Sequence, residues 1–188
     1  MKIAITGGIG AGKSFVCQWL RKYGLEVYDC DAAAKRLMRS SSMIRSSLIA
    51  LIGEHVYEQD KLQKRVMAEF ILASPDNVQA VNDIVHPAVA ADFEQSGYDW
   101  LESAILFDSN FHTRIDINKV VCVTAPLETR ISRIMRRDGI SREKALEWIH
   151  RQLPQEEVIR LSNYEICNDG NMDVDLQVRE LLKEIYNS

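Results

Sequence analysis

Residues 7–14 are Gly-Gly-Ile-Gly-Ala-Gly-Lys-Ser, and they fit the pattern G-x-x-x-x-G-K-[ST] at every position. Glycine tolerates positive φ and close backbone approach, which a loop that curls its N–H groups around phosphate requires. A helix beginning near Lys13 would add unpaired N–H donors and a positive dipole end. An incidental glycine-rich turn is disfavoured, because an apolar strand precedes the stretch and an amphipathic helix follows it. The stretch therefore predicts a nucleotide site.

The last two residues of this stretch carry the predicted chemistry. Lys13 would reach the β- and γ-phosphates, and the Ser14 hydroxyl would bind Mg²⁺. As a surface loop side chain, Lys13 is expected to contribute little to folding. The loop alone does not distinguish a kinase, an ATPase and a GTPase switch. The only Asn-Lys pair, Asn118-Lys119, lacks the aspartate of the guanine-reading N-K-x-D, which disfavours the switch.

Strand and helix patterns alternate along the chain. Strands are expected at 2–6, 26–29, 100–106, 119–124 and 165–167, and helices at 14–23, 31–38, 126–137, 141–152 and 173–186. The stretch 42–96 is expected to be mostly helical, with breaks at Gly53, Pro75 and Pro87. This alternation predicts a three-layer α/β fold with a central parallel sheet. We expect a single domain whose core covers about 1–40 and 98–188, with a helical acceptor-binding insertion at about 42–97.

Composition narrows the function classes. Lys and Arg number 23 against 27 Asp and Glu, a net charge of −4, which disfavours nucleic acid or an anionic membrane as partner. The four cysteines are scattered, as in a protein of a reducing compartment. No apolar run approaches the ~20 residues that cross a bilayer. We expect a cytoplasmic protein, a monomer or weak homo-oligomer.

Two carboxylates follow the second expected strand, at Asp29 and Asp31. Alternation along an extended segment would put both on one side, beyond the carboxyl end of the strand where ligands bind in parallel sheets. One could accept the proton of an acceptor hydroxyl, or both could help hold Mg²⁺. Alternatively, Asp31 is the N-cap of the helix that follows. The two roles do not exclude each other.

A cluster of arginines marks the helix at 126–137. Arg130, Arg133 and Arg137 fall within one arc beside its apolar stripe, whereas Arg136 points further away and is expected to be solvated. Another helix follows the Asp138-Gly139 turn. This arrangement predicts a helical lid, at about 137–160, that lays guanidinium groups on transferring phosphates.

Taken in order, these features resemble the dephospho-CoA kinase family. The family opens with T-G-G-I-G-[SA]-G-K-S, which residues 6–14 match, and residues 23–31 match its L-G-x-x-V-x-D-x-D element except at the first position. His86-Pro87, the R-x-x-x-R-D-G at 133–139 and the N-x-G at 168–170 match further family motifs. The resemblance implies ATP-dependent phosphorylation of the ribose 3′-hydroxyl of dephospho-coenzyme A, the last step of coenzyme A synthesis.

The resemblance and the loop together imply the site residues. The expected catalytic residues are Asp31, Lys13 and Arg137, and Ser14 and Asp29 are expected to hold Mg²⁺. The residues expected to bind ATP are Gly10, Ala11, Gly12, Lys13, Ser14, Phe15, Arg133, Arg137, Asn168 and Gly170. A P-loop kinase for another nucleotide or small hydroxyl acceptor, and a non-catalytic ATP-binding switch, are the alternatives.

The chain departs from the family pattern at several positions. Phe15 stands where threonine is usual, and Lys64 where arginine is common in the middle segment. Glu102 and Ala104 replace the acid and the proline of a D-x-P-L-L-x-E strand end, so Glu102 is not assigned as a metal ligand. We interpret His86 as a buried structural histidine.

Overall fold

The computed structural model describes residues 1–187 and divides into two compact units. The core unit comprises Met1–Tyr28 and the segment from Tyr98 onward, and the helical unit comprises Asp29–Gly97. Each unit has its own buried apolar residues.

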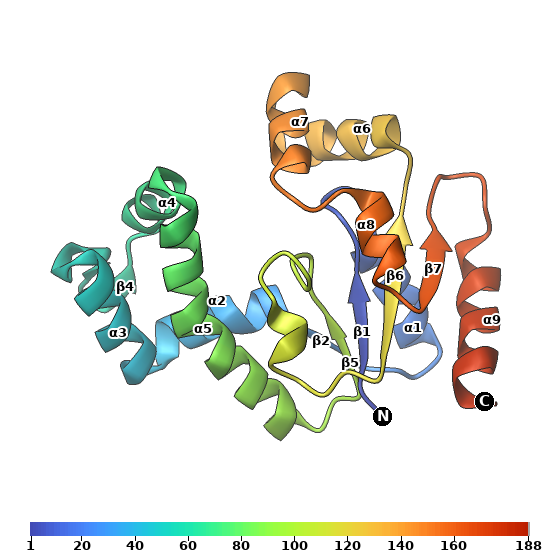
Figure 1. Ribbon diagram of the computed structural model, residues 1–188, viewed down its shortest axis with the longest axis horizontal. Coiled ribbons are helices and arrows are strands. Elements are labelled where there is room, and N and C mark those ends of the chain that lie inside the picture. Colours follow the sequence, from blue (N-terminus) through green and yellow to red (C-terminus); the bar gives the residue numbers. More distant parts are fainter. Residues whose placement is uncertain (188) are drawn as a thin grey trace. The chain divides into compact units, whose positions relative to one another are not determined.

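A five-stranded sheet forms the centre of the core unit, in the order β2-β5-β1-β6-β7 (Figure 1). These strands are β1 (Ile3–Thr6), β2 (Val27–Asp29), β5 (Trp100–Glu102), β6 (Lys119–Thr124) and β7 (Tyr164–Cys167). Strand β1 pairs in parallel with β5 and β6, and β6 pairs in parallel with β7. All four residues of β1 are buried, as expected of a parallel strand covered on both faces.

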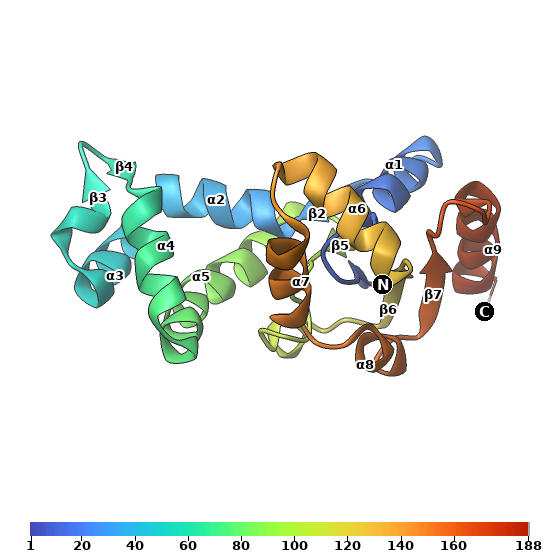
Figure 2. The same ribbon diagram turned by 90° about the horizontal axis from the view of Figure 1, so that it is seen from above.

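Helices cover both faces of this sheet (Figure 2). Helices α1 (Lys13–Lys22) and α9 (Val174–Tyr186) pack on one face, where Val16, Leu20 and Val178 are completely buried against the strands. Helix α8 (Gln155–Arg160) and the segment between β5 and β6, with its short helix η2 (Phe111–Thr113), lie on the other face. The predicted three-layer α/β fold is confirmed.

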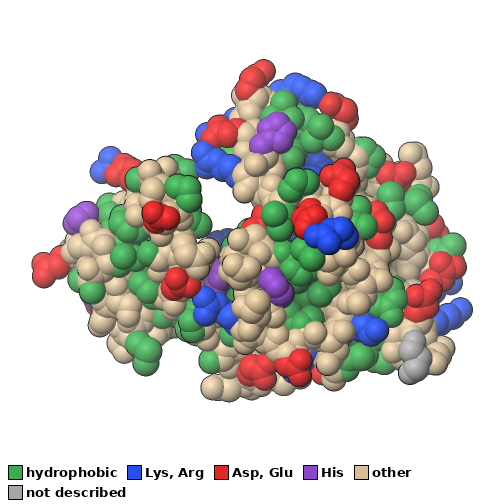
Figure 3. All heavy atoms as spheres, in the orientation of Figure 1, with side chains coloured by type: hydrophobic (Ala, Val, Ile, Leu, Met, Phe, Trp, Pro, Cys, Tyr) green, Lys and Arg blue, Asp and Glu red, His purple; other side chains and the backbone are tan. Residues whose placement is uncertain are grey.

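The remaining helices of the core unit are α6 (Leu127–Asp138) and α7 (Arg142–His150). Figure 3 shows acidic and basic side chains close together over these two helices, where Arg142 pairs with Glu128 at 2.6 Å. Among residues 1–187, no helix is both long enough and apolar enough to span a membrane.

The helical unit contains α2 (Cys30–Ser40), α3 (Ser42–Ile52), the short helix η1 (Glu54–Val56), α4 (Lys64–Ala73) and α5 (Pro75–Ser96). A hairpin of β3 (Tyr57–Glu58) and β4 (Lys61–Leu62) separates η1 from α4. Ser41 and Ser74 cap α3 and α5 through their side chains. Gly53 ends α3 with φ 113°, which confirms the predicted break there.

Two sequence predictions about the elements were wrong. Helix α5 continues through Pro87, because the buried side chains of Val85, Val89 and Phe93 hold its apolar face in place on both sides of the proline. The strand expected at 100–106 ends at Glu102, since the amide of Ser109 bonds the carbonyl of Ile105 in a local turn. The β3–β4 hairpin and α8 were not anticipated.

Candidate active site

The phosphate loop joins β1 to α1, and its glycines are required by their surroundings. Gly7 has φ 135°, and a Cβ there would lie 2.2 Å from the carbonyl oxygen of Val123. Gly12 is the N-cap of α1 with φ 93°, and a Cβ there would lie 2.1 Å from Nδ2 of Asn168. A larger residue at either position would displace β6 or the segment after β7.

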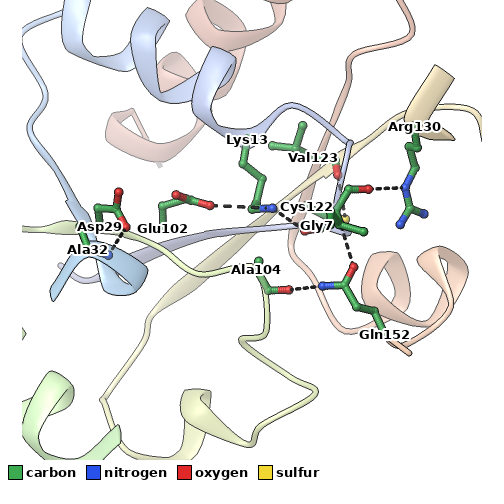
Figure 4. A network of polar contacts seen from close by, with 11 residues as sticks. Gly7, Lys13, Asp29, Ala32, Glu102, Ala104, Cys122, Val123, Arg130 and Gln152 are labelled. Carbon is green, nitrogen blue, oxygen red and sulfur yellow. Dashed lines mark hydrogen bonds and ion pairs between the residues drawn. The ribbon is translucent and has the colours of Figure 1, made fainter. Parts of the chain in front are cut away.

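Lys13 is buried, contrary to the expectation that it is a surface side chain. Its Nζ donates to the carbonyl oxygen of Gly7 at 2.9 Å and lies 3.8 Å from Oε1 of Glu102, at the end of β5 (Figure 4). Only 8% of the residue is exposed. Two groups from the core unit therefore position this ammonium group inside the loop, and we expect Lys13 to contribute to folding as well.

Backbone groups of the loop are held by two side chains far away in the sequence. Nε of Arg130, on α6, donates to the carbonyl oxygen of Ile9 at 2.9 Å. Oε1 of Gln152, after α7, accepts from the amide of Ile9 at 2.7 Å, and its Nε2 donates to the carbonyl oxygen of Ala104 at 3.3 Å (Figure 4). Arg130 is 5% exposed, and this burial lowers the pKa of its guanidinium. It nevertheless remains a cation at neutral pH.

Arg133 and Asn168 form a second set of contacts with the loop. Nη1 of Arg133 donates to the carbonyl oxygens of Gly10 and Ala11 at 3.3 and 3.1 Å, and its Nη2 donates to Oδ1 of Asn168 at 3.3 Å. Nδ2 of Asn168 donates to the carbonyl oxygen of Ala11 at 2.9 Å. The structure thus brings together three groups of predicted ATP-binding residues that are far apart in the chain.

A cavity of about 580 Å³ adjoins this network in the core unit. Among its lining residues are Gly12, Phe15, Arg133, Asn168 and Gly170, all predicted to bind ATP. Arg136 is exposed, as expected of a solvated side chain, and it also lines this cavity. The ring of Phe15 packs edge to face on Trp19, with 6.3 Å between centroids. A cavity of this volume with one aromatic wall can hold a nucleoside.

Arg137 lies apart from the loop contacts. Its side chain is 60% exposed, and its Nη2 pairs with Oδ2 of Asp138 at 2.7 Å. Along a helix the rise is 1.5 Å per residue, so Arg137 sits about 10 Å further along α6 than Arg130. Arg130, Arg133 and Arg137 therefore lie on the same side of α6, but each contacts different residues.

The two carboxylates of the helical unit differ from expectation. Helix α2 begins at Cys30, and the helix N-cap is Asp29, whose Oδ1 accepts from the amide of Ala32 at 2.8 Å. Asp31 lies in the first turn of α2, so the predictions that it caps the helix and shares one side of a strand with Asp29 were wrong. Within residues 1–187, Asp31 makes no hydrogen bond or ion pair, and it is exposed.

The oxygen atoms of the described side chains suit Mg²⁺ only when the phosphates of a bound nucleotide supply further ligands. No three His, Cys, Asp or Glu side chains among residues 1–187 form a cluster that would hold a metal. Ser14 stands exposed at the start of α1. Mg²⁺ commonly takes one or two protein oxygens beside nucleotide phosphates and water, so the Ser14 hydroxyl is a suitable ligand when a nucleotide is bound.

Sequence reasoning missed two residues that contact the phosphate loop, Gln152 and Glu102, and was correct about the burial of His86 outside the site. Nothing in the sequence pointed to Gln152, because a single glutamine carries no pattern. Glu102 was considered only as an altered metal ligand, not as the partner of Lys13. His86 is buried within α5, as expected.

Comparison with known proteins identifies relatives over the whole chain. The sequence model of a family described as dephospho-CoA kinase matches residues 1–174. A Bacteroides fragilis protein named dephospho-CoA kinase is 39% identical over 193 residues, covering 99% of this chain and 93% of that protein. One from Porphyromonas gingivalis is 44% identical over 147 residues, covering 75% of this chain and 72% of that protein.

Solved structures give the same result for the fold. The crystal structure of TT1252 from Thermus thermophilus superposes with a TM-score of 0.82 at 31% identity, covering 100% of this chain and 96% of that one. A dephospho-CoA kinase from Campylobacter jejuni superposes with a TM-score of 0.67 at 19% identity, covering 98% of each chain, and supports the fold alone.

Proposed function

The chain belongs to the dephospho-CoA kinase family, and we propose that it transfers the γ-phosphoryl group of ATP to the ribose 3′-hydroxyl of dephospho-CoA. The products are coenzyme A and ADP. The observation that carries this proposal is the phosphate loop, with Lys13 inside it, beside a nucleoside-sized cavity lined by Gly12, Phe15 and Asn168.

ATP would bind along the core unit. The N–H groups of residues 10–15 would cradle the phosphates, and the base would enter the cavity between Phe15 and Gly170. Lys13 would turn from the carbonyl oxygen of Gly7 toward the β- and γ-phosphates. Arg133, already against the loop, would add positive charge at the same position.

Phosphoryl transfer needs a base, positive charge and a positioned acceptor. The 3′-hydroxyl oxygen forms a bond to the γ-phosphorus while the bond from that phosphorus to the β–γ bridging oxygen breaks, and Asp31 accepts the hydroxyl proton. Ser14 and Asp29 would hold Mg²⁺, which neutralises phosphate charge. Arg137, in a lid of about 137–160, would contact the transferring group, and the helical insertion at about 42–97 would bind the acceptor.

The cellular setting is part of the same proposal. A net charge of −4 supports a protein with small-molecule substrates and no nucleic acid or membrane partner. We place it in the cytoplasm as a monomer or weak homo-oligomer.

An ADP-release assay tests the assignment. ADP release from ATP should depend on dephospho-CoA far more than on AMP, CMP, shikimate or gluconate. Equal turnover with AMP would instead indicate a P-loop kinase for another nucleotide. ATP binding without release stimulated by any of these acceptors would indicate a non-catalytic switch.

A further inference from the structure

The chain leaves helix α7 at Gln152, and hydrogen bonds fix the backbone on both sides of that residue. The amide of Gln152 donates to the carbonyl oxygen of Ile149, in the last turn of α7, at 3.2 Å. The amide of the next residue, Leu153, donates to Oδ1 of Asp108 at 2.7 Å. The side chain of Gln152 therefore starts from a defined position in the core unit.

The half-buried side chain of Gln152 bonds two segments of the site at once (Figure 4). Its Oε1 accepts from the amide of Ile9 in the phosphate loop, and its Nε2 donates to the carbonyl oxygen of Ala104, just after β5. The first of these segments carries Lys13 and the second carries Glu102, whose side chains form the ion pair of the site. Gln152 therefore joins the two segments that hold this pair.

Ile9 is the point at which several elements meet the phosphate loop. Its N–H donates to Gln152, and its carbonyl oxygen accepts from Nε of Arg130 on α6. Its side chain packs against an apolar cluster of α6 and α7, made up of Ile131, Ile134, Ala145 and Ile149. The N–H, the carbonyl group and the side chain of Ile9 each have a partner, and the partner of the N–H is Gln152.

The two bonds of Gln152 need one acceptor and one donor at the end of the same side chain. A primary amide has both, whereas a carboxylate only accepts and an ammonium group only donates. Methionine has nearly the same length and shape but forms neither bond well. Asparagine keeps the amide but is one methylene shorter. The bridge between Ile9 and Ala104 therefore requires the glutamine itself, and packing alone would not.

We propose that Gln152 is a positioning residue for phosphoryl transfer. It sets the spacing between the phosphate loop and the end of β5, and so aligns Lys13 and the N–H groups of residues 10–15 with the γ-phosphate. It acts through Ile9 and Ala104 and contacts neither substrate. A displacement of about 1 Å at the reacting centre can cost roughly a hundredfold in rate, so this contact acts on kcat. The inference rests on the proposed function and deepens it.

Kinetics of two variants test the proposal. Gln152→Met removes both bonds and should lower kcat about tenfold or more, with the KM values for ATP and dephospho-CoA within about threefold of wild type. Gln152→Glu keeps an acceptor for Ile9 but has no donor for Ala104 at neutral pH, so it should lose about as much. Wild-type kcat in either variant would overturn the proposal.

Two further measurements separate positioning from a general loss of structure. Calorimetric titration with ATP should give the wild-type number of sites per chain, so that slow turnover does not reflect an unfolded fraction. Gln177→Met is the matched control, because Gln177 is also half-buried and bonds both the amide and the carbonyl oxygen of Cys167, at 2.8 and 2.9 Å. It should lower the melting temperature about as much as Gln152→Met and leave kcat unchanged. An equal fall in kcat in both variants would contradict the positioning role.

Hydrogen exchange of the full chain distinguishes this inference from the proposed function. Gln152→Met should speed exchange in both bonded segments, 7–15 and 103–108, and Gln177→Met in neither. If dephospho-CoA is not a substrate of the wild type, the proposed function fails and this measurement alone decides whether Gln152 joins the two segments. Unchanged exchange in either segment would overturn that. Should Gln152→Met fail to fold, Gln152→Asn, which is too short to reach both segments, replaces it in every measurement.

Discussion

The Nζ atom of Lys13 lies 3.8 Å from Oε1 of Glu102, and the two side chains are only 9% and 18% exposed. The ammonium group of Lys13, in the phosphate loop, is thus held by the carboxylate of Glu102 at the end of β5. Both charges are largely out of water, so each contributes to compensating the other.

Lys13→Ala should abolish phosphoryl transfer and also destabilise the protein. Removing the ammonium group takes one charged partner from the largely buried Glu102, and we expect the free energy of unfolding to fall by about 1–3 kcal/mol. Urea denaturation and the ADP-release assay measure the two effects. Lys13→Met with Glu102→Gln should recover much of the stability and none of the activity. A Lys13→Ala protein as stable as the wild type would show that water compensates both charges.

Asn168→Ala should weaken ATP binding, because it removes a side chain that contacts both the carbonyl oxygen of Ala11 and the guanidinium of Arg133. We expect the KM for ATP to rise about tenfold and stability to fall by about 1–2 kcal/mol. A double-mutant cycle with Arg133→Ala should show a coupling of about 0.5 kcal/mol or more. Strictly additive effects on the KM for ATP would mean that the two side chains act separately.

Arg137→Lys should lower kcat clearly, by about tenfold or more, because lysine keeps the charge but loses the planar fork that binds phosphate through two N–H groups. Stability should stay within about 0.5 kcal/mol, since the side chain is mostly exposed. The control is Arg160→Lys, at an arginine that pairs with Glu157 on the surface. Identical kinetics for both variants would remove Arg137 from the proposed catalytic residues.

Asp31→Asn should lower turnover by roughly 10²–10⁴, the usual contribution of a positioned base, with the lower end favoured for a loose phosphoryl transition state. Its melting temperature should not change, because Asp29 caps α2. Single-turnover transfer and thermal melting, measured side by side, test both statements.

Variants of Asp29 provide the comparison. Asp29→Asn should keep the cap, whereas Asp29→Ala should lose about 1 kcal/mol of stability. If Asp29→Asn reduces turnover as much as Asp31→Asn, the two carboxylates share the metal. Wild-type turnover in Asp31→Asn would leave the reaction without its proposed base.

The thiol of Cys122 predicts a pH dependence of stability. Its pKa is raised to about 12, first by burial and then by the carboxylate of Glu165. The unfolded chain releases this proton near pH 8.5, so above that pH the unfolded state binds fewer protons and stability falls by about 1.4 kcal/mol per pH unit. Stability from this group is fully present below pH 8.5 and is lost as the pH rises toward 12. Urea denaturation between pH 8 and 10.5 should show a shallower decline for Cys122→Ala, and equal slopes would contradict the assignment.

The sequence by itself determined the phosphate loop and the class of fold. Within residues 7–14, Gly7, Gly10 and Gly12 meet the local requirement for positive φ, and Lys13 supplies one cation at a set spacing. The buried strands were recognisable for a similar reason, since apolar runs such as 119–124 reflect burial on both faces of a sheet.

Only the tertiary structure decided which side chains surround that loop. Helical periodicity gives the direction of Arg130, Arg133 and Arg137 around α6, but how far along its axis α6 meets the loop depends on packing, so the three have different neighbours. The burial of Lys13 likewise depends on Glu102, which comes from β5, 89 positions later in the chain. Contacts between distant segments follow from how the layers pack, and no local pattern encodes that packing.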